Sequence, residues 1–187
     1  MSIATRTGDQ GTTGMMYNRR VSKCHPRVEA FGCVDELNAA LGLARATCPE
    51  TALQTKLAAV QQQLVVIMGE LATAVDDLPR YVMDGFNLTT PELTASLDEY
   101  VRELEAAGLT FHGWATPGQN PPAATLDLAR TICRRAERRV CELHEKQQLR
   151  NQEIIVYLNR LSDVLWLMAR HLEGPSQHEL APPNPGS

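Results

Sequence analysis

Residues 126–140 read Leu-Asp-Leu-Ala-Arg-Thr-Ile-Cys-Arg-Arg-Ala-Glu-Arg-Arg-Val. Good helix formers fill this stretch and neither glycine nor proline interrupts it, which predicts one continuous helix. On a helical wheel of about 100° per residue, an apolar group gathers on one side: Leu128, Ile132, Ala136, Val140 and Leu143. The opposite side carries a polar group: Arg130, Arg134, Glu137, Arg138 and Cys141. The apolar side is therefore predicted to face a core and the basic side to face outward.

The basic side of this helix has two interpretations. Arginines spaced at i, i+4 and i+8 repel one another mildly unless an anion lies between them. A guanidinium also grips phosphate or carboxylate in a fixed bidentate geometry. A solvated helix face with one local ion pair is nevertheless the simpler interpretation of this stretch alone. The N-terminal sequence changes that balance.

The N-terminal segment is rich in small polar residues. Positions 5–14 read Thr-Arg-Thr-Gly-Asp-Gln-Gly-Thr-Thr-Gly. Its three glycines allow the backbone to approach a ligand closely, and its threonines add hydroxyl donors, which suits a polyphosphate with its metal ion. The Walker pattern GxxxxGK[ST] is absent from the sequence. Composition alone favours a disordered arm, whereas the nearby Arg19, Arg20 and Lys23 shift the interpretation toward anion binding.

Composition excludes several classes of protein. The net charge of −4 argues against a general nucleic-acid binder. No apolar run is long enough to span a membrane, and no charged-then-apolar leader is present, so we expect a cytoplasmic protein without a membrane partner. The five cysteines form neither a CxxC pair nor a zinc-site spacing, which predicts reduced thiols.

The remaining pattern predicts an all-α fold, because aromatic residues make up only 5% and apolar residues recur at helical spacing. Residues 1–172 are predicted to form a single domain and residues 173–187 a flexible tail. Asp35 falls close to an apolar face, where a carboxylate is either solvated or paired with a cation. Five helices are predicted: 26–48, 51–75, 90–108, the arginine helix, and 151–172. Residues 76–90 and 109–122 are predicted connections, the first with a short helical piece.

Four blocks together resemble the PduO-type corrinoid adenosyltransferases, over about residues 3–171. The blocks lie in residues 5–13, in 20–30, in 34–38, and in 129–139 with 157–163. The resemblance implies a five-helix bundle with an irregular N-terminal nucleotide-binding segment, assembled as a homotrimer with active sites between subunits. It also implies the reaction, in which the Co(I) ion of a reduced corrinoid such as cobalamin attacks C5′ of ATP and expels triphosphate. The product is adenosylcobalamin.

The resemblance also assigns roles to residues. Arg134, Asp35 and Arg130 would be catalytic, with Asp35 paired with Arg130 across the subunit interface. Glu137 would contact Mg²⁺. The residues implied in ATP binding are Thr5, Arg6, Thr7, Gly8, Asp9, Gly11, Thr12, Thr13, Lys23, Arg134, Glu137, Arg138 and Asn159. Those implied on the corrinoid side are Trp114, Phe111 and Phe31, with Trp114 or Phe111 excluding the lower axial ligand. Local hydrogen bonding between helices is an open alternative for Asn159 and Asp163, and an indole packed on the bundle's end for Trp114.

Two stretches depart from the related sequences. Residues 14–19 read Gly-Met-Met-Tyr-Asn-Arg where relatives usually read Ser-Leu-Phe-Gly-Gly-Glu, and residues 114–119 read Trp-Ala-Thr-Pro-Gly-Gln where they usually read Phe-x-Leu-Pro-Gly-Gly. These changes lie at the exit of the nucleotide loop and on the corrinoid side, so they would alter the preference for substrate more than the type of reaction. A corrinoid carrier or chaperone with little turnover is therefore the alternative function, and a helical nucleic-acid regulator fits the acidic chain poorly. An electron-donating reductase and an adenosylcobalamin-dependent enzyme are the expected protein partners.

Overall fold

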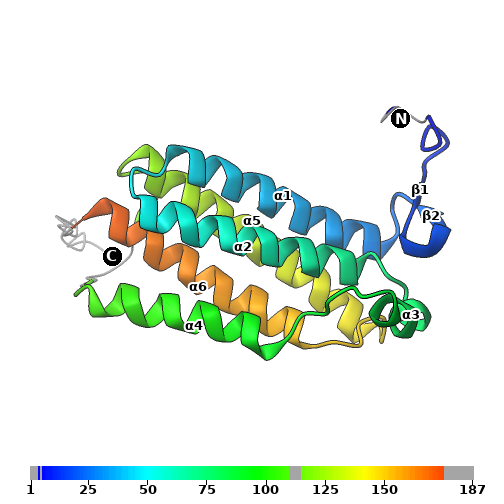
Figure 1. Ribbon diagram of the computed structural model, residues 1–187. Helices are drawn as coiled ribbons and strands as arrows, with labels where there is room; N and C mark the ends of the chain where they lie inside the picture. Colours follow the sequence, from blue (N-terminus) through cyan, green and yellow to red (C-terminus); the bar gives the residue numbers. More distant parts are fainter. Residues whose placement is uncertain (1–3, 5, 110–114, 175–187) are drawn as a thin grey trace, which may run out of the picture.

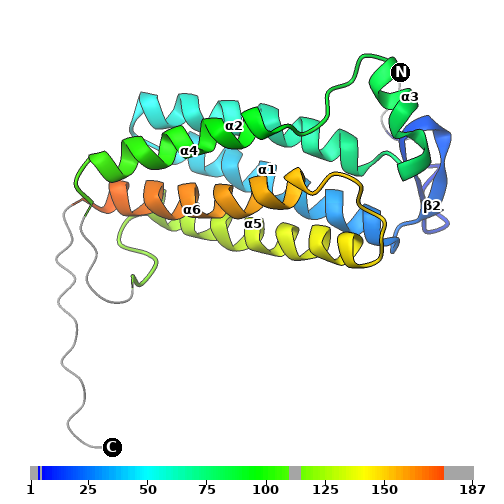
Figure 2. The same cartoon turned by 90° about the horizontal axis from the view of Figure 1, so that it is seen from below.

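The computed structural model describes residues 4, 6–109 and 115–174. Its long helices lie side by side along one bundle (Figures 1 and 2). In this bundle α1 contacts α2 and α5, and α6 contacts α5 and α4. The long helices are α1 (Pro26–Thr47), α2 (Thr51–Leu71), α4 (Pro91–Ala106), α5 (Pro121–Glu145) and α6 (Glu153–Glu173). All five contribute buried residues to one hydrophobic core.

The all-α prediction is confirmed, and the described chain has six helices rather than five. The sixth, α3 (Leu78–Met83), follows the 3-10 turn Val75–Asp77 and lies where a short helical piece was predicted in the 76–90 connection. The second long helix also ends at Leu71 rather than Val75. At this end the helix contacts Arg27 of α1, whose Nη1 donates hydrogen bonds to the carbonyl oxygens of Leu71 and Thr73. A buried guanidinium thus takes carbonyls that the next helical turn would have used.

The predicted apolar side of the arginine helix is confirmed at Ala136, Val140 and Leu143, which are buried, and is wrong at its N-terminal half. Leu128 is 51% exposed and Ile132 is only partly buried. The structure instead buries a stripe that contains small residues: Leu126, Ala129, Cys133, Ala136, Val140 and Leu143. Because α5 packs against both α1 and α6, small side chains lie where the helix backbones approach closely. Hydrophobicity alone gave the large Leu128 and Ile132 too much weight.

The N-terminal segment forms a short hairpin, which the sequence did not predict. Strand β1 (Thr12–Gly14) pairs antiparallel with β2 (Arg20–Ser22), with Thr13 opposite Val21. The turn between them contains a 3-10 helix, Met16–Asn18. Strands of three residues are too short to show an alternating pattern. In Figures 1 and 2 the hairpin and α3 lie together at one end of the bundle.

The two ends of the described chain lie at opposite ends of the bundle (Figure 1). Glu173, assigned by prediction to the tail, is the last residue of α6, and Gly174 follows with φ 75°. The rest of the predicted tail, residues 175–187, lies outside the described residues. No single described helix is long and apolar enough to cross a membrane. Only α2 together with Val75–Met83, two segments bent by 106° relative to each other, would be long and apolar enough among the described helices.

Candidate functional site

The N-terminal loop folds back on itself at the base of the hairpin. The amide of Asp9 donates to the carbonyl oxygen of Arg6 (3.4 Å), and the amide of Gly11 donates to that of Gly8 (3.1 Å). Gly11 has φ 76°, a left-handed conformation that glycine adopts without steric cost. The amide of Lys23 then donates to the carbonyl oxygen of Gly11 (2.9 Å), which joins the loop to the chain beyond β2.

Two cationic side chains lie against this loop. Nη2 of Arg20 donates to the carbonyl oxygen of Thr7 (2.6 Å) and to Oγ1 of Thr12 (2.5 Å). The ammonium group of Lys23 lies beside Gly8, where a Cβ atom would come within 3.2 Å of Nζ. The glycine therefore provides the room that the lysine occupies. Backbone turns and two cationic side chains thus lie in one place, an arrangement suited to an anion. The predicted loop residues all lie in this part of the chain, and all but Thr5 are among the described residues.

A second set of predicted residues gathers where α5 meets α6. Cys133 is buried there and its thiol donates to the carbonyl oxygen of Leu158 (3.2 Å). Burial raises the pKa of the Cys133 thiol, the carboxylates of Glu137 and Asp163 raise it further, and the Arg134 guanidinium acts in the opposite direction. These three charged groups from two helices therefore lie around the same buried thiol. They define one face of the molecule, here called the α5–α6 face.

Arg134 and Arg138 lie exposed on α5, and neither makes an ion pair with another described residue. Nη1 of Arg138 donates only to the carbonyl oxygen of Arg134 (3.0 Å). Two other arginines of this stretch pair with acidic residues of α1: Arg135 with Glu36, and Arg139 with Glu29 (3.3 Å). Of the five arginines in residues 126–140, only Arg134 and Arg138 therefore lack an acidic partner among the described residues. Asn159 is also exposed, one turn before Asp163 on α6.

Asp35 and Arg130 are not paired within one chain. Asp35 is exposed on α1, and Arg130 Nε lies 3.7 Å from Oδ1 of Asp127. Both of these last two atoms are buried without a hydrogen-bond partner among the described residues. Asp127 Oδ2 accepts a hydrogen bond from Arg170 Nη2 (2.6 Å). The sequence analysis missed this buried pair, although an aspartate inside an apolar helix stripe was a signal that a cation must face it.

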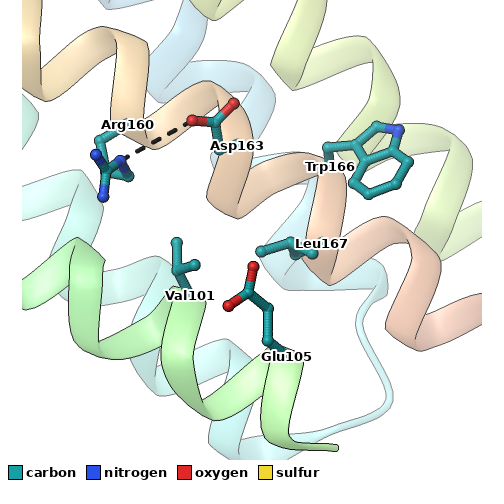
Figure 3. Close-up of a pocket in the computed structure, with 6 residues that line it drawn as sticks. All are labelled: Val101, Glu105, Arg160, Asp163, Trp166 and Leu167. Atoms are coloured by element: carbon teal, nitrogen blue, oxygen red, sulfur yellow. Dashed lines mark ion pairs between the residues drawn. The ribbon is translucent and has the colours of Figure 1, made fainter. Parts of the chain in front are cut away.

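The predicted corrinoid side is only partly described. Phe111 and Trp114 lie outside the described residues, and Phe31 is partly buried against the core. A pocket of about 300 Å³ opens between α4 and α6, with one aromatic residue that the sequence analysis did not single out, Trp166. Figure 3 shows Val101, Glu105 and Leu167 pointing toward one another between these helices. The pocket's residues are Val101, Glu105, Arg160, Asp163, Trp166 and Leu167.

Metal ligands are sparse in the described part of the chain. No group of three or more histidine, cysteine, aspartate or glutamate side chains there is arranged to hold a metal ion. Glu137 is half-buried on the α5–α6 face beside Arg134. One carboxylate with substrate phosphates is a common way for proteins to bind Mg²⁺, so the donor set fits a magnesium ion that arrives with a nucleotide.

Comparison with known proteins gives consistent matches. Residues 3–172 match the family model described as cobalamin adenosyltransferase. The chain is 42% identical over 173 residues to the corrinoid adenosyltransferase PduO of Salmonella typhimurium, covering 91% of this chain and 49% of that protein, so it spans about half of that relative's length. It is 40% identical over 172 residues to a cobalamin adenosyltransferase of Cupriavidus metallidurans, covering 91% of this chain and 87% of that protein.

Solved structures agree with the sequence matches. A variant PduO-type ATP:corrinoid adenosyltransferase from Lactobacillus reuteri, complexed with cobalamin and ATP, superposes with a TM-score of 0.84 at 32% sequence identity, over 92% of this chain and 91% of that one. Another variant of the Lactobacillus reuteri protein, complexed with ATP, gives a TM-score of 0.82 at 32% identity, over 92% and 94% of the two chains.

Proposed function

Because the chain belongs to the cobalamin adenosyltransferase family, we propose that it transfers the 5′-deoxyadenosyl group of ATP to the Co(I) ion of a reduced corrinoid. The Co–C5′ bond forms as the C5′–O bond to triphosphate breaks, and the electron pair of Co(I) makes the new bond. The product is adenosylcobalamin when the corrinoid is cobalamin. The leaving triphosphate carries a large negative charge, so the protein must neutralise charge as this bond breaks.

The observation that carries the proposal is the pair of unpaired guanidinium groups on the α5–α6 face. Arg134 and Arg138 have no acidic partner in the described chain, whereas Arg135 and Arg139 do. An unpaired arginine is available for bidentate contact with phosphate oxygens. We assign Arg134 to the developing charge on triphosphate, and Arg138 and Asn159 to nucleotide binding. Residues 5–13 and Lys23 would bind the phosphates from the other side.

Glu137 would hold the magnesium ion that accompanies ATP. When bound, Mg²⁺ supplies positive charge at the phosphate oxygens and so stabilises the leaving group. Glu137 lies within one helical turn of both Arg134 and Arg138, so its negative charge would also offset the repulsion between the two guanidinium groups.

We further propose that the active site is completed by a second copy of the chain in a homotrimer. Figure 1 shows the N-terminal hairpin at the end of the bundle, whereas Arg134 belongs to the middle of α5. Leu43 on α1 and Leu128 on α5 are each 51% exposed. Their helices are adjacent there, since the hydroxyl groups of Thr47 and Thr125 lie 3.3 Å apart. A face with exposed leucines is suited to a subunit interface. Asp35 would reach Arg130 of the neighbouring subunit across it.

On the corrinoid side, we assign Trp114, with Phe111 as the second choice, to the lower face of the corrin ring. An aromatic side chain there would exclude the axial ligand and so ease reduction to Co(I). The loop that carries both residues begins after α4, whose Glu105 also borders the α4–α6 pocket. Phe31 would contribute through its exposed part only. Residues 1–172 would act as one cytoplasmic domain, with a reductase and an adenosylcobalamin-dependent enzyme as partners.

The proposal is tested by mixing the protein with ATP, magnesium and chemically reduced cobalamin. Formation of the cobalt–carbon bond is followed by the change in absorbance, with many turnovers expected per active site. A protein that binds cobalamin and ATP but forms no product would instead be a carrier or chaperone of the same fold. That outcome would overturn the transferase assignment. Omission of magnesium, which should slow the reaction, is the matched test of the metal.

A further inference from the structure

The turn of the N-terminal hairpin, residues 15–19, has an unusual backbone. Tyr17 and Asn18 have φ of 60° and 57°, in the left-handed region that residues with side chains seldom adopt. Asparagine tolerates this region better than most residues, but tyrosine does not. A conformation of this kind persists only where the surroundings hold it in place. The contacts of the neighbouring side chains show what does so.

The turn is attached to the segment from the end of α2 through α3. The amide of Met16 donates to the carbonyl oxygen of Ala72 (3.1 Å). The hydroxyl of Tyr17 donates to Oδ2 of Asp84 (2.9 Å), and the Arg80 guanidinium lies 4.3 Å from the centre of the Tyr17 ring. Burial raises the pKa of the Tyr17 hydroxyl and its bond to Asp84 raises it further, so this donor keeps its proton.

Arg19 adds a bidentate ion pair to the same segment. Its Nη2 donates to Oδ1 of Asp77 (2.9 Å) and its Nε donates to Oδ2. Two parallel hydrogen bonds of this kind fix orientation as well as distance. The side chain of Asp77 is only 18% exposed, so the pair is partly shielded from water. The hydrogen bonds from Arg19 hold the pKa of Asp77 below its ordinary value.

The next residue, Arg20, makes its contacts on the opposite side of the strand. In an extended chain successive side chains point to opposite faces. Arg19 therefore binds the hairpin to the α3 segment, while Arg20 binds Thr7 of the loop as well as Thr12 of β1. Two adjacent arginines thus connect the bundle to the N-terminal loop through one short strand. Figures 1 and 2 both show β2 beside α3, at the end of the bundle from which the loop extends.

We propose that Arg19 and Tyr17 are positioning residues for the nucleotide: they lock the hairpin onto α3 and thereby set where loop 6–13 presents its amides and Lys23. The inference rests on the proposed function for the identity of the ligand. Neither side chain touches the phosphates. The position of the loop is what they determine, so their loss lowers affinity for ATP and leaves the corrinoid side unchanged.

The test compares the wild-type protein with Arg19→Glu, which reverses the charge that faces Asp77. ATP binding is measured by calorimetry without corrinoid, and turnover is measured at varied ATP and varied cobalamin. We expect affinity for ATP to fall by about tenfold or more, because the lost bonds to Asp77 no longer hold the loop in its binding position and a charge-assisted hydrogen bond is worth about that factor. The KM for cobalamin and the melting temperature stay unchanged. The swap Arg19→Glu with Asp77→Arg restores ATP affinity, and Arg102→Glu on the exposed face of α4 is the control for charge alone.

Equal ATP affinity in wild type and Arg19→Glu would overturn the inference, whatever the turnover. A parallel rise in both KM values with a lower melting temperature would also overturn it, because it would make the contact merely structural. A wild-type protein that binds ATP in an Arg19-dependent way but forms no adenosylated corrinoid would support the inference and refute the transferase assignment. Tyr17→Phe removes only the hydroxyl bond to Asp84, and we expect it to weaken ATP binding less than Arg19→Glu.

Discussion

Arg170 and Arg134 lie on neighbouring helices of one bundle, yet their surroundings are opposite. Arg170 is 2% exposed and donates hydrogen bonds to Asp127 (2.6 Å) and Glu173 (2.7 Å). Burial by itself would lower the pKa of Arg170, but its bonds to the two carboxylates outweigh burial and raise it. Arg134 is exposed and has no acidic partner among the described residues. The first arginine has its partners within the chain and serves the fold, whereas the second requires a partner from outside.

The largest expected effect follows from breaking the buried group. Arg170→Met removes the guanidinium that bonds to Asp127 and Glu173, and removing one member of a buried pair costs about 3–5 kcal/mol. We expect the free energy of unfolding to fall by about that amount, measured by urea denaturation followed by circular dichroism. The double variant Asp127→Asn with Arg170→Met should lose less than the sum of the singles, because no carboxylate then remains at position 127. A loss no larger than that of exposed Arg102→Met would contradict the assignment of Arg170 to the fold.

The exposed arginine should behave in the opposite way. Arg134→Ala should lower product formation by about 10²–10³-fold, the usual cost of removing a group that stabilises developing charge. The melting temperature and circular dichroism spectrum should stay nearly unchanged, because Arg134 makes no ion pair in the described chain. Arg102→Ala, an exposed arginine on α4, is the matched control and should keep its activity. Ordinary activity in Arg134→Ala would reduce this stretch to a solvated helix face.

Much of the fold could be predicted because proline and glycine mark several helix ends in the sequence. Pro26 begins α1 as predicted, and α4 ends two residues before Gly108, which has φ 78°. The N-terminal half of the buried side of α5 was misplaced because small residues such as Ala129 and Cys133 are buried there, and hydrophobic periodicity undervalues them. The hairpin was missed for a different reason. Its strands depend on contacts of the turn with a segment about 60 residues away, which no local pattern encodes.

The site was predicted by resemblance more than by pattern. The motif residues predicted a nucleotide loop, and the structure gathers the described residues of that segment at one end of the bundle. Tyr17 was noted only as a departure from the relatives, and Arg19 was also taken as a sign of anion binding, whereas the structure pairs it with Asp77. Their positions correspond to a glycine and a glutamate in the usual pattern, so a positive φ and a reversed charge were the signals for new contacts. The proposed pairing of Asp35 with a second subunit could not be derived from the residues, because the periodicity of one chain carries no information about contacts between chains.

The smallest expected effect concerns Arg130, which lies near the buried Asp127–Arg170 pair but is also one of the arginines on the basic side of α5. Its Nε lies 3.7 Å from Asp127, yet that nitrogen is buried without a hydrogen-bond partner among the described residues. Asp35 is exposed, as a residue reserved for a neighbouring subunit would be in a single chain. Asp35→Asn and Arg130→Ala should therefore each weaken assembly and activity. The double variant should be no worse than the more damaging single, with a coupling of about 0.5–3 kcal/mol.

A second double-mutant cycle distinguishes the two possible partners of Arg130, which are Asp127 and Asp35. Asp127→Asn combined with Arg130→Ala should show its coupling in the free energy of unfolding, because Asp127 is buried in the same chain. Asp35→Asn combined with Arg130→Ala should show its coupling in trimer assembly, measured by analytical ultracentrifugation, and in product formation. Strictly additive losses in the Asp35 cycle would refute the pairing across subunits. Coupling confined to unfolding would instead assign Arg130 to the buried group of Arg170, since only an interaction between chains depends on protein concentration.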